Sequence, residues 1–255
     1  MHEKPLQMRI AAMTHPGLIR THNEDCIGVT DWSRASPMAS PVIIECSIDE
    51  PRLCVVADGL GGHSAGEVAS TLVVRELAAA ASEFKGPESV KAALHAINKR
   101  LYDIMQASPQ LIGMGSTIAG LVTIDLDICL FNVGDSRVYL AVGDYLRLLS
   151  KDDSADAKNS DPSQRTGINS HGITQSLGGL SSFSPIDPHL IIRPAKPEDR
   201  YLLCSDGLTD MLDLDAIEAS LTKDARSSVE RLVQEALTAG GVDNISVIIV
   251  EIILP

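Results

Sequence analysis

Short runs of β-branched and other apolar residues, joined by turns of only two or three residues, are the strongest constraint on the fold of this chain. The run 117–124 is separated from the run 128–133 by residues 125–127, and residues 134–136 separate that second run from 137–142. Parallel strands need a crossover of a dozen or more residues, whereas a turn this short joins antiparallel neighbours. The pattern therefore predicts antiparallel sheets.

Further strands are expected at 53–57, 201–204 and 245–252. The last of these is apolar except at Ser246 and Glu251, which predicts a central strand covered on both faces. Long helical patterns alternate with these strands, so the chain is of a mixed α and β class, with helix pairs covering the sheet faces.

The helix boundaries follow from local signals. Ser64 and Glu67 have the spacing of a capping box, which predicts a helix from Ser64 to about Phe84. A second helix is expected from Pro87 to just before Pro109, because a proline in the first turn loses no hydrogen bond. A second helical pair is expected at 214–221 and 228–238, ending at the two glycines 240 and 241.

Charge and hydropathy exclude several classes of partner. The chain has 255 residues, with 21 Lys and Arg against 34 Asp and Glu, for a net charge of −13. This excess of negative charge argues against a nucleic acid or an anionic membrane as the main partner. No apolar run approaches the ~20 residues that span a bilayer, and the N-terminus lacks the apolar region of a signal peptide. A cytoplasmic location and a monomeric state are expected.

The chain is long enough to bury a large core without disulfides or a structural metal, so any metal ion would serve chemistry. A single domain over residues 1–255 is expected. The cysteines are odd in number and widely spaced, and we expect them to be reduced and mostly buried; they are Cys26, Cys46, Cys54, Cys129 and Cys204.

Acidic residues recur beside glycine or asparagine at the ends of the apolar runs. A buried carboxylate at a strand end is costly unless it is neutralised, and several together repel one another. A divalent cation would resolve both problems, and oxygen donors without His or Cys at ligand spacing favour Mg²⁺ or Mn²⁺ over zinc. Any one of these segments alone could be an ordinary turn; together they are 23–25, 55–59, 203–207 and 242–244.

Six ordered motifs resemble those of the metal-dependent protein phosphatases, the type 2C serine/threonine phosphatases, and are most similar to the compact bacterial members. The resemblance spans roughly residues 8–252. It implies an α+β fold, a four-layer α-β-β-α sandwich of two mainly antiparallel sheets flanked by helix pairs, with the metal ions at one end. The motifs are RTHNED (20–25), VADGLGGH (56–63), GST (115–117), NVGDSR (132–137), CSDGLTD (204–210) and GVDNISV (241–247).

The resemblance also implies a set of metal ligands. Asp58 should bridge two metal ions, and Asp206 and Asp243 should complete the shell of the first. Glu24 and the backbone carbonyl of Gly59 should serve the second. A glycine is suited to this place because it lets the backbone turn sharply.

Arg20 matches the arginine that binds the substrate phosphate, a role that suits the paired donors and permanent charge of a guanidinium. The implied reaction is the hydrolysis of phosphoserine or phosphothreonine in proteins, by in-line attack of a hydroxide that bridges the two ions. Asp58 and Arg20 would be the catalytic residues. The partners would be phosphorylated proteins and a bacterial serine/threonine kinase that this phosphatase opposes.

Three departures from the family pattern affect these expectations. Leu60 stands where animal members have a proposed general-acid histidine, so the proton should come from elsewhere, first of all from a metal-bound water, and we expect His63 to be structural. Ile112 replaces an aspartate that many bacterial members use, with Asp206, to bind a third ion; a third ion should be weak or absent. The polar excursion at about 150–179, with ends at 152–154 and 172–177, resembles the family's flap but is more acidic.

Two alternatives remain open. The chain could be an inactive relative that binds a phosphoprotein as a regulatory module, but retaining clustered acids and Arg20 would then have no physical purpose. It could also be a phosphomonoesterase for small molecules. A closed pocket would favour that function and an open cleft would favour a peptide substrate, and the sequence does not decide between them.

Overall fold

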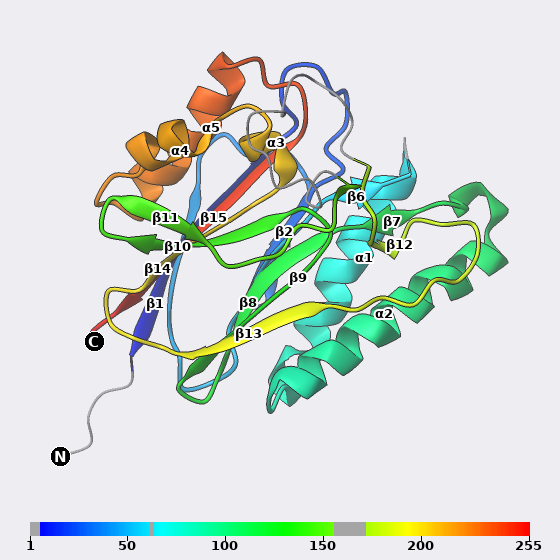
Figure 1. Ribbon diagram of the computed structural model, residues 1–255, viewed down its shortest axis with the longest axis horizontal. Coiled ribbons are helices and arrows are strands. Elements are labelled where there is room, and N and C mark those ends of the chain that lie inside the picture. Colours follow the sequence, from blue (N-terminus) through cyan, green and yellow to red (C-terminus); the bar gives the residue numbers. More distant parts are fainter. Residues whose placement is uncertain (1–5, 62–63, 156–171) are drawn as a thin grey trace.

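The computed structural model describes residues 6–61, 64–155 and 172–255, and these residues form two six-stranded antiparallel sheets that face each other (Figure 1). The first sheet has the strand order β11 (Tyr145–Leu148), β10 (Arg137–Val142), β14 (Arg200–Cys204), β15 (Ile245–Ile253), β1 (Gln7–His15) and β4 (Val42–Ser47). The second has the order β13 (His189–Pro194), β9 (Asp127–Val133), β8 (Ile118–Ile124), β5 (Leu53–Ala57), β2 (Cys26–Val29) and β3 (Trp32–Arg34).

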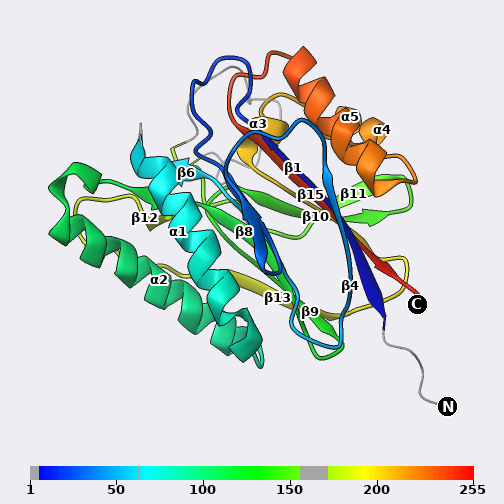
Figure 2. The ribbon, with the colours of Figure 1, turned by 180° about the vertical axis from the view of Figure 1, so that it is seen from behind.

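Helices cover the outer face of each sheet. The helices α1 (Ser64–Ala80) and α2 (Pro87–Ala107) lie against the second sheet, and α4 (Leu214–Ser220) and α5 (Ala225–Thr238) lie against the first (Figure 2). The short helix α3 (Asp206–Thr209) follows β14, and single 3₁₀ turns occur at Ala81–Glu83 and Pro109–Leu111. The predicted α+β sandwich of four layers is confirmed.

Three apolar layers hold the sandwich together, and the alternation of side chains along each strand explains them. In β5, Val55 packs toward α1 and α2, whereas Val56 packs between the two sheets. In β15, Ile248 lies between the sheets and Ile249 lies under α5. Because β15 lies between β14 and β1 and is covered on both faces, the prediction of a central strand is confirmed.

Only one of the two short turns on which the prediction was based joins antiparallel neighbours. Residues 125–127 connect β8 to β9, but residues 134–136 lead from β9 in the second sheet to β10 in the first, so the prediction was wrong for that turn. β8 pairs with β9, and every strand pairing in the described part of the chain is antiparallel. The bounds of β5 and β10 agree with the predictions, and those of β8, β9, β14 and β15 differ by one residue. The strands β1 to β4, β11 and β13 were not predicted, and neither was a small third sheet of β12 (Leu177–Gly178), β7 (Gly115–Ser116) and β6 (Gly59–Leu60).

The helix predictions need two corrections. The helix α1 ends at Ala80, and a 3₁₀ turn continues the chain toward Phe84. The helix α5 begins at Ala225 rather than 228, because the side chain of Asp224 accepts a hydrogen bond from the Ser227 N–H at 2.8 Å and caps the earlier start. The helix α2 has the predicted bounds.

The cysteines are all free thiols, and only Cys46 is not fully buried, which confirms the prediction. Among the described helices, none is both long enough and apolar enough to cross a bilayer.

Candidate metal centre

Strand pairing brings the predicted acidic segments to one end of the sandwich. In the second sheet, Cys26 at the start of β2 pairs with Ala57 at the end of β5. Glu24, which precedes β2, and Asp58, which follows β5, therefore lie at the same end of these neighbouring strands. In the first sheet, the Ser205 N–H after β14 donates to the Ser246 carbonyl at the start of β15, at 3.1 Å. Asp206 and Asp243 flank this contact in the sequence. The two sheets thus present their acids to each other.

Glu24 and Gly59 meet at the start of α1. A Cβ atom added to Gly66 would lie against the Glu24 carboxylate oxygen Oε2, and it would lie 2.9 Å from the Gly59 carbonyl oxygen. A side chain at position 66 would therefore occupy the space between these two oxygens. The two groups expected to bind the second ion approach a common point, and the closeness of the backbone explains why glycine is needed there.

The carboxylates at this end of the molecule repel one another. Burial raises the pKa of Asp58 well above its ordinary value, and the charges of Asp206, Asp25 and Asp243 raise it further. Burial likewise raises the pKa of Asp206, with further contributions from Asp135, Asp210 and Asp243. Each charged carboxylate makes ionisation of its neighbours less favourable. A bound cation would offset this repulsion, so the group as a whole favours cation binding.

Unsatisfied oxygens support the same conclusion. In the described part of the chain, three buried carboxylate oxygens have no hydrogen-bond partner, namely Oδ1 of Asp25, of Asp135 and of Asp206. A buried oxygen without a donor is costly. Oxygen donors that are buried, acidic and unpaired suit a hard divalent cation such as Mg²⁺ or Mn²⁺. The residues present therefore fit the metal ions that the sequence predicts.

The carboxylates do not yet enclose an ion. Among the described residues, no group of three or more His, Cys, Asp and Glu side chains has an arrangement that could hold a metal ion. One reason is that Asp243 is engaged elsewhere: its Oδ2 accepts a hydrogen bond from Arg20 Nη2 at 2.7 Å. The sequence did not predict this ion pair between the phosphate-binding candidate and a candidate ligand.

Asn244 ties the candidate residues together, and the sequence analysis gave it no role. Its Oδ1 accepts from the Glu24 N–H at 2.7 Å, and its Nδ2 donates to the carbonyls of Pro16 at 3.0 Å and His22 at 2.9 Å. These bonds fix both ends of the loop that carries Arg20 against the segment that carries Asp243. The Asp-Asn pair was visible in the sequence, but the partners of the amide are more than 200 residues away.

Thr117 of the GST motif holds the backbone of Asp58, which belongs to the VADGLGGH motif. Its Oγ1 accepts from the Asp58 N–H at 3.2 Å, and its own N–H donates to the Asp58 carbonyl at 2.9 Å. Its hydroxyl also shares a hydrogen bond of 2.7 Å with Ser136 of the NVGDSR motif. The backbone of Asp58 is therefore held in place on both sides.

Asp25 is a buried acid that the sequence analysis listed only as part of a motif. Its Oδ2 accepts from Ser205 Oγ at 2.8 Å and from Ser246 Oγ at 2.7 Å, so it links β2 to the two central strands of the other sheet. Burial raises its pKa to about 6 in spite of these hydrogen bonds. The buried Asp135 also has a pKa raised by burial to about 6.

The positions that depart from the family pattern lie around this centre. Leu60 is partly buried in β6, and the side chain of Ile112 is 54% exposed. His63 lies outside the described residues, so its expected structural role stays a prediction.

The two ends of the predicted flap lie side by side. The Ala155 N–H donates to the Gly172 carbonyl, and the Thr174 N–H donates to the Asp153 carbonyl. The Asp153 N–H in turn donates to the Gly134 carbonyl at 2.9 Å. The rest of the excursion, residues 156–171, lies outside the described residues, so the flap stays a prediction.

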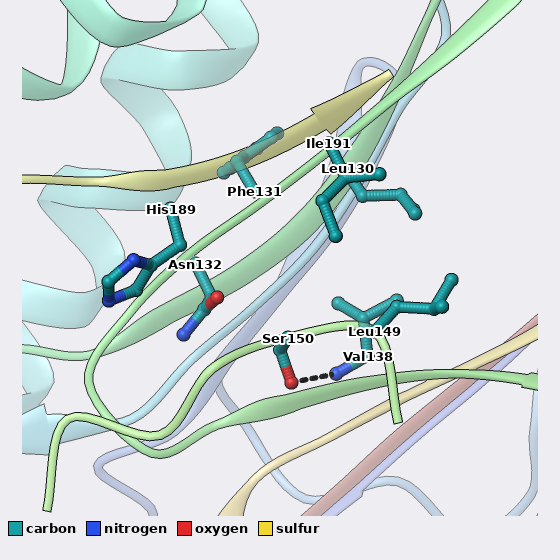
Figure 3. A pocket seen from close by; sticks show the side chains of 8 residues that line it. All are labelled: Leu130, Phe131, Asn132, Val138, Leu149, Ser150, His189 and Ile191. Atoms are coloured by element: carbon teal, nitrogen blue, oxygen red, sulfur yellow. Dashed lines mark hydrogen bonds between the residues drawn. The ribbon is translucent and has the colours of Figure 1, made fainter. Parts of the chain in front are cut away.

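A small pocket lies beside the flap ends, between β9, β10 and β13 (Figure 3). Its lining is mainly apolar, with Asn132, Ser150 and His189 as polar members. His189 Nε2 is 2.9 Å from Asp153 Oδ1 and braces the start of the flap. None of the candidate metal ligands lines this pocket, so it gives no support to a closed small-molecule site at the metal centre.

Comparisons with known proteins agree with the fold and show the family. The family model described as Protein phosphatase 2C matches residues 45–240, and the chain belongs to this family. It is 33% identical to the serine/threonine protein phosphatase PstP of Mycobacterium tuberculosis over 254 residues, which cover 97% of this chain and 46% of that protein. This chain thus spans about half the length of PstP. It is also 31% identical to the serine/threonine phosphatase stp of Listeria innocua, covering 93% of each.

The solved structures include the catalytic domain of PstP in complex with two manganese ions. It superimposes with a TM-score of 0.79 at 33% identity, covering 97% of this chain and 99% of that one. A serine/threonine phosphatase from S. agalactiae superimposes with a TM-score of 0.76 at 27% identity, covering 96% and 99%.

We expect Asp25 to make the metal-free protein less stable as the pH rises. Its folded-state pKa of about 6 exceeds the ordinary value of 3.8, so the folded state holds the proton more tightly, and this stabilisation is lost as the pH rises from about 4 through 6. The full shift corresponds to about 3 kcal/mol at most. Asp25→Asn cannot ionise and should escape this loss, so its free energy of unfolding should rise relative to the natural protein between pH 4.5 and 7.

Urea unfolding in the presence of EDTA measures this difference. Asp127→Asn, at an exposed position at the start of β9, is the matched control and should follow the natural protein at both pH values. A constant difference between Asp25→Asn and the natural protein across this pH range would contradict the assignment.

Proposed function

We propose that this chain is a Mg²⁺- or Mn²⁺-dependent protein phosphatase that hydrolyses phosphoserine and phosphothreonine. The observation that carries the proposal is that mutually repelling carboxylates from distant segments, among them Asp58, Asp206 and Asp243, lie at one end of the sandwich beside the guanidinium of Arg20. Membership of the Protein phosphatase 2C family and the manganese-bound relative support it.

The proposed ligands divide into two groups. Asp58 would serve both ions, Asp206 and Asp243 would serve the first, and Glu24 with the Gly59 carbonyl would serve the second. When bound, two neighbouring divalent ions lower the pKa of water and offset the negative charge of the phosphoryl group that is transferred.

Arg20 is the residue of this chain that binds the phosphate. Its side chain is 56% exposed, so its remaining donors can reach a ligand in solvent. The hydrogen bond to Asp243 holds it beside the candidate ligands, and a phosphate dianion offers the paired acceptors that a guanidinium prefers. A substrate phosphate would bind to Arg20 beside Asp243, one of the residues that would hold the first ion.

Two supporting residues hold the backbone around these groups. Thr117 holds the backbone of Asp58 on both sides, and Asn244 holds the loop of Arg20 against Glu24 and Asp243. Leu60 has no proton to give to the leaving serine or threonine oxygen. The proton would therefore come from elsewhere, first of all from water at the centre.

The proposed substrates are phosphorylated proteins, and the proposed counterpart is a bacterial serine/threonine kinase acting in the cytoplasm. The names of the PstP and stp relatives support the substrate class. A serine or threonine phosphate on a protein must approach a rim that is open at Arg20, and the pocket of Figure 3 lies apart from the candidate ligands.

The direct test is hydrolysis of p-nitrophenyl phosphate, a phosphothreonine peptide and a phosphotyrosine peptide, with Mn²⁺ and with EDTA. Metal-dependent turnover of the first two is expected, and Asp206→Asn should lower it by about 100-fold or more because a ligand to the first ion is lost. Asp127→Asn is the control and should retain full activity.

Each contrary outcome has a meaning. An absence of metal-dependent turnover on all three substrates would favour the regulatory module. Turnover of p-nitrophenyl phosphate without turnover of the phosphothreonine peptide would favour a small-molecule phosphomonoesterase. Full activity of Asp206→Asn would contradict the ligand assignment.

We also propose that a third ion binds weakly or not at all. The side chain of Ile112 offers no oxygen, although Asp135 and Asp210 lie near enough to Asp206 to raise its pKa. Titration with Mn²⁺ followed by calorimetry should give two ions for the natural protein, and Ile112→Asp should gain a third. Three ions in the natural protein would contradict this proposal and would point to Asp135 and Asp210 as the donors.

A further inference from the structure

Three large apolar side chains are exposed at the edge of the candidate metal centre. Leu18 is 63% exposed, Ile19 is 67% exposed and Val242 is 39% exposed. Leu18 and Ile19 directly precede Arg20, and Val242 directly precedes Asp243. We call these three residues the rim patch. Isolated apolar residues are common on protein surfaces, so the position of these three matters more than their exposure.

The two segments that carry the rim patch lie side by side. The Leu18 N–H donates to the Gly241 carbonyl at 2.7 Å. A Cβ atom added to Gly241 would lie 3.1 Å from the Leu18 side chain. Two residues further along each segment, Arg20 is paired with Asp243. The rim patch is therefore continuous with the place where the phosphate is proposed to bind.

The backbone holds the rim patch in its exposed position. Gly17 has a φ of +78°, and a side chain there would collide with the backbone of Asp243. Asn244 binds the carbonyls of Pro16 and His22, at either end of the loop. Because the loop is fixed at both ends, its apolar side chains cannot turn inward to the core. Burial of a leucine or isoleucine side chain by a partner would be favourable.

We propose that the rim patch binds an apolar side chain of the substrate protein, close in sequence to the phosphorylated residue. This inference rests on the proposed phosphatase function and names a specificity determinant for it. An extended chain advances by about 3.3 Å per residue, and the patch begins one residue from Arg20. An apolar residue one to three positions from the phosphoresidue can therefore reach it while the phosphate is held by Arg20.

The charge of the surroundings disfavours an acidic occupant. Next to the patch lie Asp243 and the acids of the metal centre, and the chain as a whole carries a net charge of −13. An acidic residue beside the phosphoresidue would be repelled. An apolar residue is not repelled by these charges, and burying its side chain against the patch is favourable.

Matched phosphothreonine peptides test the proposal. Each peptide carries leucine or serine at one of the six positions from −3 to +3 around the phosphothreonine. For the natural protein, leucine should raise kcat/KM by about fivefold or more over serine at one position at least. The Ile19→Gln, Val242→Thr double variant should bring that ratio close to one.

Two further measurements make the result specific. Turnover of p-nitrophenyl phosphate, which has no flanking residues, normalises each variant for damage to the metal centre. Leu126→Gln removes another exposed apolar side chain, 67% exposed in the turn between β8 and β9, and should keep the full preference for leucine.

The outcomes separate this inference from the function on which it rests. Equal kcat/KM for leucine and serine at every position in an active enzyme would overturn the rim patch alone, as would a preference that survives in the double variant. An absence of turnover on every peptide and on p-nitrophenyl phosphate would overturn the proposed function as well.

Discussion

Repulsion among buried carboxylates is the constraint on which the rest of this structure depends. Asp58 and Asp206 each have a pKa raised by burial and by neighbouring acids that come from the other sheet or from another motif. Such a group lowers the stability of the folded state at neutral pH unless a cation is bound. The sandwich tolerates it because large apolar layers lie between the sheets and under both helix pairs.

Hydrogen bonds to uncharged groups keep the acids in place against this repulsion. Asp58 is held through its backbone by Thr117, and Asp25 is held through its side chain by two serine hydroxyls. Asn244 does the same for the loop of Arg20. The loop that this amide anchors carries both Arg20, the proposed phosphate-binding residue, and two residues of the rim patch.

Much of the fold could be predicted because its strands have local signals. The strand β5 is a continuous apolar run that ends at Asp58, and β10 is bounded by short turns on both sides. The strand β1 was missed because its sequence, QMRIAAMTH, is rich in alanine and methionine and contains Arg9, and it becomes a strand only by pairing with β15 and β4. The start of α5 was missed because the capping aspartate, Asp224, four residues before the predicted start, was not recognised.

The candidate site likewise has residues that could be predicted from the sequence and residues that could not. Asp58, Asp206 and Asp243 could be named from the sequence, since each lies beside a recognisable apolar run, whereas Glu24 was named from the family resemblance. The role of Asn244 and the pairing of Arg20 with Asp243 depend on contacts between the two ends of the chain, and no local pattern reports them. Membership of the Protein phosphatase 2C family explains why the motifs occur in this order.

The most direct test of the central claim compares the free energy of unfolding at pH 7.5 in Mn²⁺ and in EDTA, for the natural protein and for Asp58→Asn. The account predicts that Mn²⁺ at 100 times its Kd stabilises the natural protein by about 2.7 kcal/mol for each site, and that Asp58→Asn loses most of this gain while being no less stable than the natural protein in EDTA. Equal stabilisation of both proteins by Mn²⁺, or none of either, would contradict it.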